Sequence, residues 1–355
     1  MLHNCEAVCF YQVTRVEVTV RQVSGLLVLL ALAPAGLEAQ QDAALPIREW
    51  TVPWGRQGRP RDPFVAPDGK IVFVGQAGNY IARLDPASGE FKQYEIDPGT
   101  NPHNVIVDDK GMAWYAGNRN GMIGKLDLST GAITRYPMPD SASRDPHTMM
   151  FDGKGNIWFT MQRSGRVGRL NMTTGKVDVI VTGERTNPYG LVVDKNGRPW
   201  FDLFATNKIG TVDPATLKLQ EYPLPSDSAR PRRIAMTTDG AVWYVDYRRG
   251  FLGRLDPKTG TVKEWANPSG RQSLPYAMSV DDQDRLWFVE TGVQPNRFVG
   301  FDSKTERFIA NTPVPGGGGT VRHMTFDPKT RVIWFGTDLG TIGRAEVGKA
   351  GGLTP

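Results

Sequence analysis

The stretch DGKGNIWFTMQRSGRVGRL (residues 152–170) contains the pattern that decides the fold. A Gly-rich turn comes first, an Ile-Trp-Phe run follows, and after a second turn comes the segment Val-Gly-Arg-Leu. The Trp recurs in the same context six times, at spacings of 42 to 47 residues: Trp114, Trp158, Trp200, Trp243, Trp287 and Trp334. A seventh copy without the Trp lies at residues 71–73. A fixed period of this length indicates a repeat architecture.

Each repeat reads as four short strands. After the Val-Gly-Arg-Leu segment comes a further turn, as at residues 174–175, and a closing segment such as ITRYP at residues 133–137. Turns rich in Gly, Asp and Asn separate strand-like runs throughout. A four-stranded unit repeated seven times predicts an all-β fold, a seven-bladed β-propeller. We expect the Trp and its neighbouring aromatic residue to pack between blades.

The two ends of the repeat region predict how the ring closes. The seventh repeat ends at residues 342–347 and lacks a fourth strand, whereas residues 47–53 match the closing segment of the other repeats. We therefore expect the N-terminal strand of the mature chain to pair in the last blade, which removes an open sheet edge. This gives a single propeller domain at residues 40–347 and a loose tail at residues 348–355.

The first 39 residues differ from the repeats. Arg21 precedes a short apolar run at residues 26–33, and small residues follow it. This order is typical of a secretory signal peptide, and the run is shorter than the roughly 18 residues that a membrane span needs. We expect an N-terminal extension with a signal peptide at residues 1–39, cleavage before Gly36 or Gln40, and a periplasmic or secreted protein.

The composition excludes several classes of protein. Both cysteines, Cys5 and Cys9, lie in the signal segment, so the mature chain has neither a disulfide framework nor a thiol nucleophile. Without residues 1–39, 40 basic side chains face 34 acidic ones, a net charge of +6 without a run of Lys or Arg. This balance favours a soluble monomer that does not bind nucleic acid and has no stable membrane span.

The starts of the innermost strands predict a ligand site. In a propeller these strands run along the central channel, so their first residues surround one channel mouth. In most repeats a proline precedes the first residue of the innermost strand. When the repeats are aligned on this proline, each blade places one large side chain at the channel mouth: Phe64, His103, His147, Tyr189, Arg232, Tyr276 and His323. All three histidines of the mature chain are in this set. Aromatic, imidazole and guanidinium groups together favour a small-molecule or peptide ligand, although the position could simply favour large planar side chains.

Charged residues near the same mouth refine this hypothesis. Three acidic residues follow second strands and are either carboxylates of the site or turn residues: Asp246, Glu290 and Asp338. Four arginines make the rim basic, which favours an anionic or carbonyl-rich ligand: Arg230, Arg232, Arg233 and Arg322. A metal site made of three histidines is disfavoured, because the channel keeps non-adjacent blades apart.

The repeats resemble the streptogramin B lyases, also called virginiamycin B lyases, over roughly residues 45–347. The resemblance rests on the Pro-His or Pro-Tyr strand starts, the Trp-Phe pair, the Ile-Gly-Arg or Ile-Gly-Lys strand, and Tyr-Pro-x-Pro closing segments such as residues 136–139 and 222–225. It implies a carbon–oxygen lyase, associated with antibiotic resistance, that opens the ester of a cyclic depsipeptide by elimination with a magnesium ion. In such chemistry a base removes the proton α to a carbonyl, and the metal stabilises the developing charge.

The family's functional residues carry over only in part. The resemblance implies that His323 is the base and that Asp338 is a metal ligand, but the family's other metal carboxylate is replaced by Val321. The substrate-contacting His aligns with Tyr276, and the Tyr of the first blade aligns with Phe64. We expect the remaining mouth residues to contact substrate: Arg232, Tyr189, His103, His147 and Arg322.

Three functions remain open from the sequence. The first is an exported lyase of this kind, acting on an ester or lactone through His323. The second is a non-catalytic propeller that binds a glycan, a peptide or an envelope partner over its mouth. The third is a different lactone-acting enzyme on the same ring, because propellers carry unrelated activities.

Overall fold

In the computed structural model, the described residues are 44–349, and they form 28 β-strands and three short 3-10 helices. The strands of the first four sheets are β2 (Pro60–Val65), β3 (Ile71–Gly75), β4 (Tyr80–Leu84), β5 (Phe91–Glu95), β6 (Pro102–Val107), β7 (Met112–Gly117), β8 (Met122–Asp127), β9 (Ile133–Pro137), β10 (Pro146–Phe151), β11 (Asn156–Met161), β12 (Arg166–Asn171), β13 (Val177–Val181), β14 (Pro188–Val193), β15 (Pro199–Leu203), β16 (Lys208–Val212) and β17 (Leu219–Pro223).

The last three sheets contain β18 (Pro231–Met236), β19 (Val242–Asp246), β20 (Phe251–Leu255), β21 (Val262–Ala266), β22 (Pro275–Val280), β23 (Arg285–Glu290), β24 (Arg297–Asp302), β25 (Arg307–Pro313), β26 (Val321–Asp327), β27 (Val332–Thr337), β28 (Thr341–Ala345) and β1 (Ile47–Thr51). The 3-10 helices are η1 (Arg56–Gly58), η2 (Gly270–Ser273) and η3 (Val347–Lys349).

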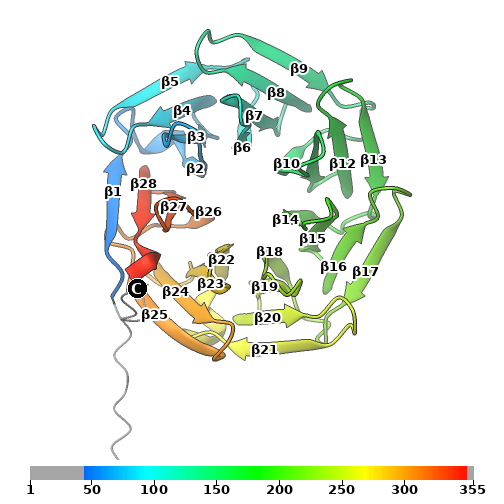
Figure 1. Cartoon of the computed structure of the whole chain (residues 1–355), viewed down its shortest axis with the longest axis vertical. Helices are drawn as coiled ribbons and strands as arrows, with labels where there is room; N and C mark the ends of the chain where they lie inside the picture. The colour runs from blue at the N-terminus through cyan, green and yellow to red at the C-terminus, as the bar shows by residue number, and fades with distance from the viewer. Residues whose placement is uncertain (1–43, 350–355) are drawn as a thin grey trace, which may run out of the picture. The chain divides into compact units, whose positions relative to one another are not determined.

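The strands form seven four-stranded antiparallel sheets arranged around a central channel (Figure 1). Six sheets contain four consecutive strands, beginning with β2-β3-β4-β5, and the first strand of each lies innermost. The predicted seven-bladed β-propeller is therefore confirmed. The connections from second to third strands, and from each outermost strand to the next blade, lie where the innermost strands begin. We call this side the mouth face.

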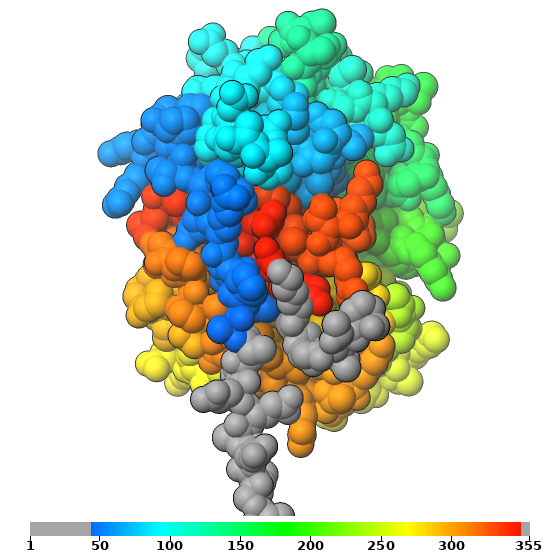
Figure 2. Space-filling view, turned by 60° about the vertical axis from the view of Figure 1, so that its left-hand side comes forward, coloured from blue at the N-terminus to red at the C-terminus, as the bar shows by residue number. Residues whose placement is uncertain are grey.

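The ring closes as predicted. The seventh sheet has the order β1-β28-β27-β26, and β1 pairs antiparallel with β28 in a register that sets Trp50 opposite Ile342. Figure 2 shows this junction, with the first described residues against the red C-terminal strands. The predicted signal peptide and the tail beyond Lys349 lie outside the described residues. Within residues 44–349, no helix has the length and apolar character needed to cross a membrane.

The repeated aromatic residues form the packing between blades. Trp158 is fully buried and packs in one cluster with Leu191 and Phe201 of the next blade. Phe159 lies opposite Gly168 in the neighbouring strand, and a Cβ on Gly168 would overlap the Phe159 ring. The Ile-Gly-Arg and Val-Gly-Arg motifs therefore have a steric cause, since the Gly makes room for the aromatic ring of the preceding strand. The same arrangement recurs in other blades, at Tyr115 with Gly124 and at Tyr244 with Gly253.

Candidate functional site

The innermost strands begin at equivalent positions in all seven blades. The first residue of each lies opposite the last residue of its neighbouring strand, as Pro102 lies opposite Gly117. The regular register is interrupted directly afterwards in six blades, and one residue later, after Arg61, in the first blade. These first residues are Pro60, Pro102, Pro146, Pro188, Pro231, Pro275 and Val321. A bulge re-aims side chains, and here it lets successive residues of one strand contribute to the channel mouth.

Two rings of residues follow from this register. The residues directly after the first position form the mouth ring: Arg61, His103, His147, Tyr189, Arg232, Tyr276 and Arg322. The next residues form the second ring: Asp62, Asn104, Thr148, Gly190, Arg233, Ala277 and His323. The alignment made from the sequence is therefore wrong in two blades. His323 lies one position deeper than His103 and His147, and Phe64 lies beyond both rings, where it lines a cavity in the channel.

The first blade contains two prolines, Pro60 and Pro63, and the alignment on Pro63 hides the site residues Arg61 and Asp62. The sequence did contain a signal for the correct choice. Pro60 precedes the end of the next strand, Gly75, by 15 residues, and the strand-starting prolines of the five following blades show the same spacing.

The side chains of the mouth ring contact one another across blades. The hydroxyl groups of Tyr189 and Tyr276 are hydrogen-bonded to each other. The guanidinium of Arg232 lies 3.8 Å from the centre of the Tyr276 ring and 4.2 Å from that of Tyr247. The rings of His103 and His147 are stacked, with centroids 3.4 Å apart and planes tilted by 31°. Residues predicted from separate repeats thus form one continuous packed layer, in which Arg232 and Arg322 are the partly exposed members.

Arg233 spans the channel beneath this layer. Its Nη1 donates to Thr148 Oγ1 at 2.9 Å, its Nε donates to the carbonyl oxygen of Arg322 at 3.2 Å, and its Nη2 lies 3.9 Å from Asp62 Oδ2. Asp62 is fully buried and accepts hydrogen bonds from Arg61 Nε at 2.9 Å and Asn104 Nδ2 at 3.1 Å. One buried carboxylate therefore holds two buried guanidinium groups, and the local charge stays positive.

This charge distribution governs how the buried groups titrate. Burial raises the pKa of Asp62, but the charges of Arg61, His323 and Arg233 outweigh it and leave the pKa well below its ordinary value. The pKa of His323 is lowered to about 4, because burial, the largest cause, acts together with Arg233 and Arg61 and outweighs the opposing charge of Asp62. Burial and the nearby cations also lower the pKa values of His103 and His147 well below the usual 6.5. All three imidazoles are therefore neutral at pH 7.

The pKa of Tyr276 is lowered, whereas burial alone raises the pKa of a tyrosine. Burial raises its pKa, but the positive charges of Arg232, Arg61, Arg233 and Arg322 outweigh burial and lower the pKa to about 8. The phenol of Tyr276 is therefore close to ionisation at neutral pH.

Several polar atoms of both rings lack hydrogen-bond partners among the described residues. These buried nitrogens are Arg61 Nη2, Arg232 Nε, Arg233 Nη2, His103 Nδ1, His147 Nε2 and His323 Nδ1. Leaving a buried donor or acceptor unpaired costs about 1–3 kcal/mol, and native structures rarely gather several in one place. These nitrogens are hydrogen-bonding capacity that the mouth does not use within residues 44–349.

The residues at the expected magnesium position do not fit the metal. Val321 is fully buried and has no ligating atom, and both oxygens of Asp338 are paired with Arg322, Oδ1 with Nε at 2.9 Å and Oδ2 with Nη2 at 2.6 Å. A guanidinium thus already occupies the carboxylate that would bind Mg²⁺. Across residues 44–349, no group of three or more His, Cys, Asp and Glu side chains could hold a metal ion.

The other two acidic candidates have structural roles. The buried carboxylate of Asp246 accepts the backbone N–H groups of Arg230, Arg248 and Arg249. Glu290 accepts the backbone N–H of Ser269 at 3.0 Å. Both carboxylates tie together loops of the mouth face, and these hydrogen bonds favour a structural role over a role in the site.

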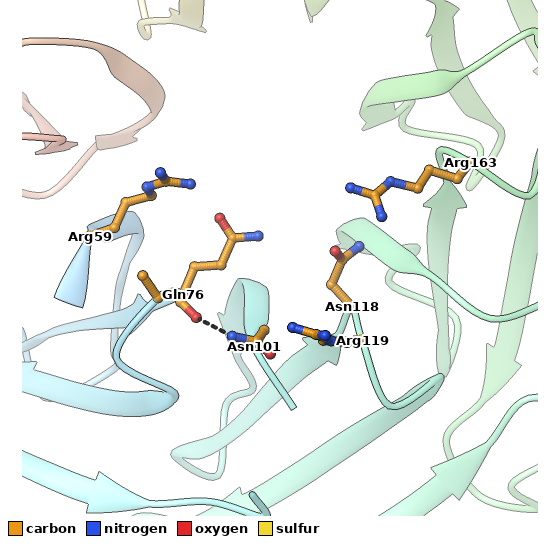
Figure 3. A pocket seen from close by; sticks show the side chains of 7 residues that line it. Arg59, Gln76, Asn101, Asn118, Arg119 and Arg163 are labelled. Carbon is orange, nitrogen blue, oxygen red and sulfur yellow. Dashed lines mark hydrogen bonds between the residues drawn. The ribbon is translucent and has the colours of Figure 1, made fainter. Parts of the chain in front are cut away.

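A pocket of about 490 Å³ adjoins the mouth over the first three blades (Figure 3). We call it the blade 1–3 pocket, and it is lined by Arg59, Gln76, Ala77, Asn101, Asn118, Arg119 and Arg163. Gln76 joins it to the mouth ring, because its Oε1 accepts a hydrogen bond from Arg61 Nη1 at 2.9 Å. This pocket could not be predicted from the sequence, because its residues come from loops of three different repeats.

Known proteins share this sequence pattern and this architecture. Residues 46–345 match the Virginiamycin B lyase family. A solved streptogramin B lyase is 27% identical, with a TM-score of 0.76, over 85% of this chain and 97% of that one. A catalytically inactive virginiamycin B lyase from Staphylococcus aureus with quinupristin is 22% identical, with a TM-score of 0.76, over 85% of this chain and 99% of that one.

A more distant structure shares the fold. The extracellular domain of a putative one component system from B. thetaiotaomicron is 18% identical, with a TM-score of 0.61, over 81% of this chain and 40% of that one. Among curated proteins, no sequence matches.

Proposed function

This chain belongs to the virginiamycin B lyase family, and we propose that it is an exported, monomeric carbon–oxygen lyase that acts at its channel mouth by elimination, without magnesium. In such a reaction a base takes the proton from the carbon α to a carbonyl. The electron pair of the broken C–H bond forms a double bond between the α and β carbons. The bond from the β carbon to oxygen breaks, and the departing oxygen receives a proton.

His323 is the base in this proposal. Its ring is neutral at pH 7, since its pKa is lowered to about 4, and its Nδ1 has no hydrogen-bond partner among the described residues. A neutral imidazole with a free nitrogen can accept a proton directly. Arg233 and His323 line the same channel cavity. The guanidinium of Arg233 therefore supplies the positive charge that the reacting carbonyl needs near the base.

The guanidinium groups of the mouth take the role of the metal. Elimination develops negative charge on the carbonyl oxygen, and fixed donors in a water-poor site stabilise such charge strongly. The guanidinium nitrogens of Arg61, Arg232 and Arg233 that have no hydrogen-bond partner within residues 44–349 are the single observation that carries the proposal. Tyr276, whose pKa is lowered to about 8, is the mouth-ring acid best suited to return a proton to the departing oxygen.

The test is a turnover assay of the purified mature protein on a panel of cyclic depsipeptides and lactones, with and without EDTA. Elimination gives a ring-opened product of unchanged mass, whereas hydrolysis adds one water, so mass spectrometry separates the two reactions. We expect ring opening without added mass that survives EDTA and is lost in His323→Gln. Loss of activity in EDTA, restored by Mg²⁺, would contradict the proposal.

The pH profile adds an independent check on the base. Because the pKa of His323 is lowered to about 4, kcat/KM should rise as pH passes through about 4 and stay level from pH 5 to 7. If kcat/KM instead rises around pH 6.5, the base is a histidine with an ordinary pKa, and the proposed role of His323 is contradicted. Export is tested separately, since the protein recovered outside the cytoplasm should begin at Gly36 or Gln40.

Binding without catalysis is the second candidate. It is favoured by the blade 1–3 pocket, whose guanidinium groups lie away from the proposed base. It predicts saturable binding of an anionic ligand with no chemical change in that ligand, and with equal affinity in wild type and His323→Gln.

A further inference from the structure

The blade 1–3 pocket presents guanidinium groups that have no charge partner within residues 44–349. Arg59, Arg119 and Arg163 are exposed, and in the described part of the chain none of them forms an ion pair. Figure 3 shows the side chains of Arg59 and Arg163 reaching toward the pocket from different blades, with Arg119 between those blades. Three cations that converge without a carboxylate favour an anionic occupant.

No acidic side chain is available to neutralise the pocket from within. Its lining contains only arginine, amide and alanine side chains. The nearby carboxylate of Asp145 is buried and accepts the backbone N–H groups of Arg163 and Ser164, so it is committed to holding their loop. The positive field of the pocket is therefore directed to solvent.

The pocket is continuous with the mouth ring. Gln76 accepts from Arg61, as described above, and Asn101 directly precedes the Pro102-His103 strand start. Asn118 Nδ2 donates to the carbonyl oxygen of Pro146 at 3.1 Å, next to His147. A ligand that fills the pocket therefore lies beside the strand starts that carry His103 and His147.

A second pocket of about 430 Å³ lies across the mouth, over the fourth to sixth blades, with Phe204, Arg230, Tyr247 and Arg248 in its lining. Arg232 connects it to the mouth, because its guanidinium lies 4.8 Å from the Phe204 ring and 4.2 Å from the Tyr247 ring. Cationic surface thus extends on both sides of the channel, which suits a chain-like ligand better than a compact one.

We propose that the ligand of this surface is an acidic oligosaccharide, a chain of 4-linked hexuronate units, with one carboxylate at the mouth ring and another in the blade 1–3 pocket. Arginine binds carboxylates through paired N–H groups, and the amides of Gln76, Asn101 and Asn118 suit the sugar hydroxyls between them. A nucleic acid would meet the same charge, and it is therefore one arm of the test.

The substrate class rests on the proposed function, because elimination has a natural target in such a chain. In a 4-linked uronate, H5 lies on the carbon α to the carboxylate, and the glycosidic oxygen on C4 lies on the β carbon. The base removes H5 as a proton, the C5–H electron pair forms the C4=C5 double bond, and the C4–O bond breaks. The departing oxygen leaves with that bond's electron pair and receives a proton, so no oxidant or further reactant is needed.

The experiment measures binding and conversion separately. Oligogalacturonate is the probe, with the same oligomer reduced at its carboxyl groups and a single-stranded DNA of equal charge as comparisons. The triple variant Arg59→Gln, Arg119→Gln, Arg163→Gln removes the pocket's cations. Its matched control is Lys110→Gln, Lys258→Gln, Lys304→Gln, which removes three exposed cations from turns on the opposite face. Affinity is measured by calorimetry, and the new C=C–COO⁻ group by its ultraviolet absorbance.

We expect the wild type to bind the uronate chain, to ignore the reduced chain, and to lose at least about tenfold in affinity in the arginine triple variant but not in the control. Binding without any new double bond supports the oligosaccharide site and counts against the proposed lyase function. Ring opening of a lactone by a protein that does not bind oligogalacturonate overturns the substrate class and leaves the lyase function standing. Equal affinity for the DNA, or equal loss in both triple variants, overturns the proposal.

Discussion

The packing layer between the blades and the mouth ring use equivalent backbone positions in every blade, yet their side chains follow opposite rules. In the packing layer the residue type repeats, as with Phe159 over Gly168 and Tyr244 over Gly253. In the mouth ring the seven equivalent positions hold three Arg, two His and two Tyr.

This difference separates the residues that hold the blades together from the residues that are available for function. Each blade packs only against its neighbours, so one solution for the interface serves all of them. The mouth is where seven blades meet, and there each blade can contribute a different group. Function in this fold therefore lies in positions that the repeat leaves free.

The largest effect is expected in the packing layer. Trp158→Ala should lower the free energy of unfolding by about 3–5 kcal/mol, because it removes a fully buried indole between two blades. Urea denaturation followed by circular dichroism measures this change. Arg163→Gln at the mouth face is the control and should stay within about 0.5 kcal/mol of wild type. A cost below about 1 kcal/mol for Trp158→Ala would mean that the blades are not held by this layer.

Asp62→Asn tests a carboxylate of the mouth that stabilises the fold. It should cost about 3 kcal/mol near neutral pH, because Arg61 and Arg233 lose their buried carboxylate. The pKa of Asp62 is lower in the folded protein than the ordinary 3.8, so its contribution is fully present above about pH 4 and is lost as pH falls through the folded pKa.

The pH series therefore decides the origin of that cost. Urea denaturation of wild type and Asp62→Asn at pH 7, 5 and 3 should show a difference that is constant from 7 to 5 and begins to shrink at 3. A difference that does not depend on pH would indicate altered packing rather than a lost charge.

The fold was predictable because the packing layer repeats. The Trp spacing, the Gly that recurs in most third strands and the incomplete seventh repeat are all visible in one sequence, and they define blade number and closure. The site was predictable only in part. Its backbone position follows from the repeat, but the choice between Pro60 and Pro63 misplaced the first blade, and His323 was placed one position too shallow.

The contacts within the mouth could not be predicted, since they join distant repeats. Arg233 and Thr148 are 85 residues apart, and Tyr189 and Tyr276 are 87 apart. The pairing of Arg322 with Asp338 likewise depends on side-chain directions that no local pattern encodes. The repeat predicts the region in which side chains meet, but which side chains contact one another is known only from the structure.

A smaller effect tests the Gly rule of the packing layer. Gly168→Ala should cost about 1–3 kcal/mol, because the added methyl group overlaps the ring of Phe159. The double variant with Phe159→Leu should cost less than the sum of the two single variants, since the smaller side chain makes room for the methyl group. Simple additivity in urea denaturation would show that the two residues do not share the same space.

The smallest effect separates the two regions by the ionisation of one residue type. In the packing layer, burial followed by Asp97 raises the pKa of Tyr115 to about 12, whereas at the mouth the cations led by Arg232 overcome burial and lower that of Tyr276 to about 8. An absorbance titration should therefore show one tyrosine ionising near pH 8 in wild type and none there in Tyr276→Phe. Arg232→Gln should move that transition upward, because the guanidinium 3.8 Å from the ring is lost, while Arg163→Gln should leave it in place. If wild type shows no transition below pH 10, the mouth lacks the positive potential on which anion binding depends, and buried tyrosines would then behave alike in both regions.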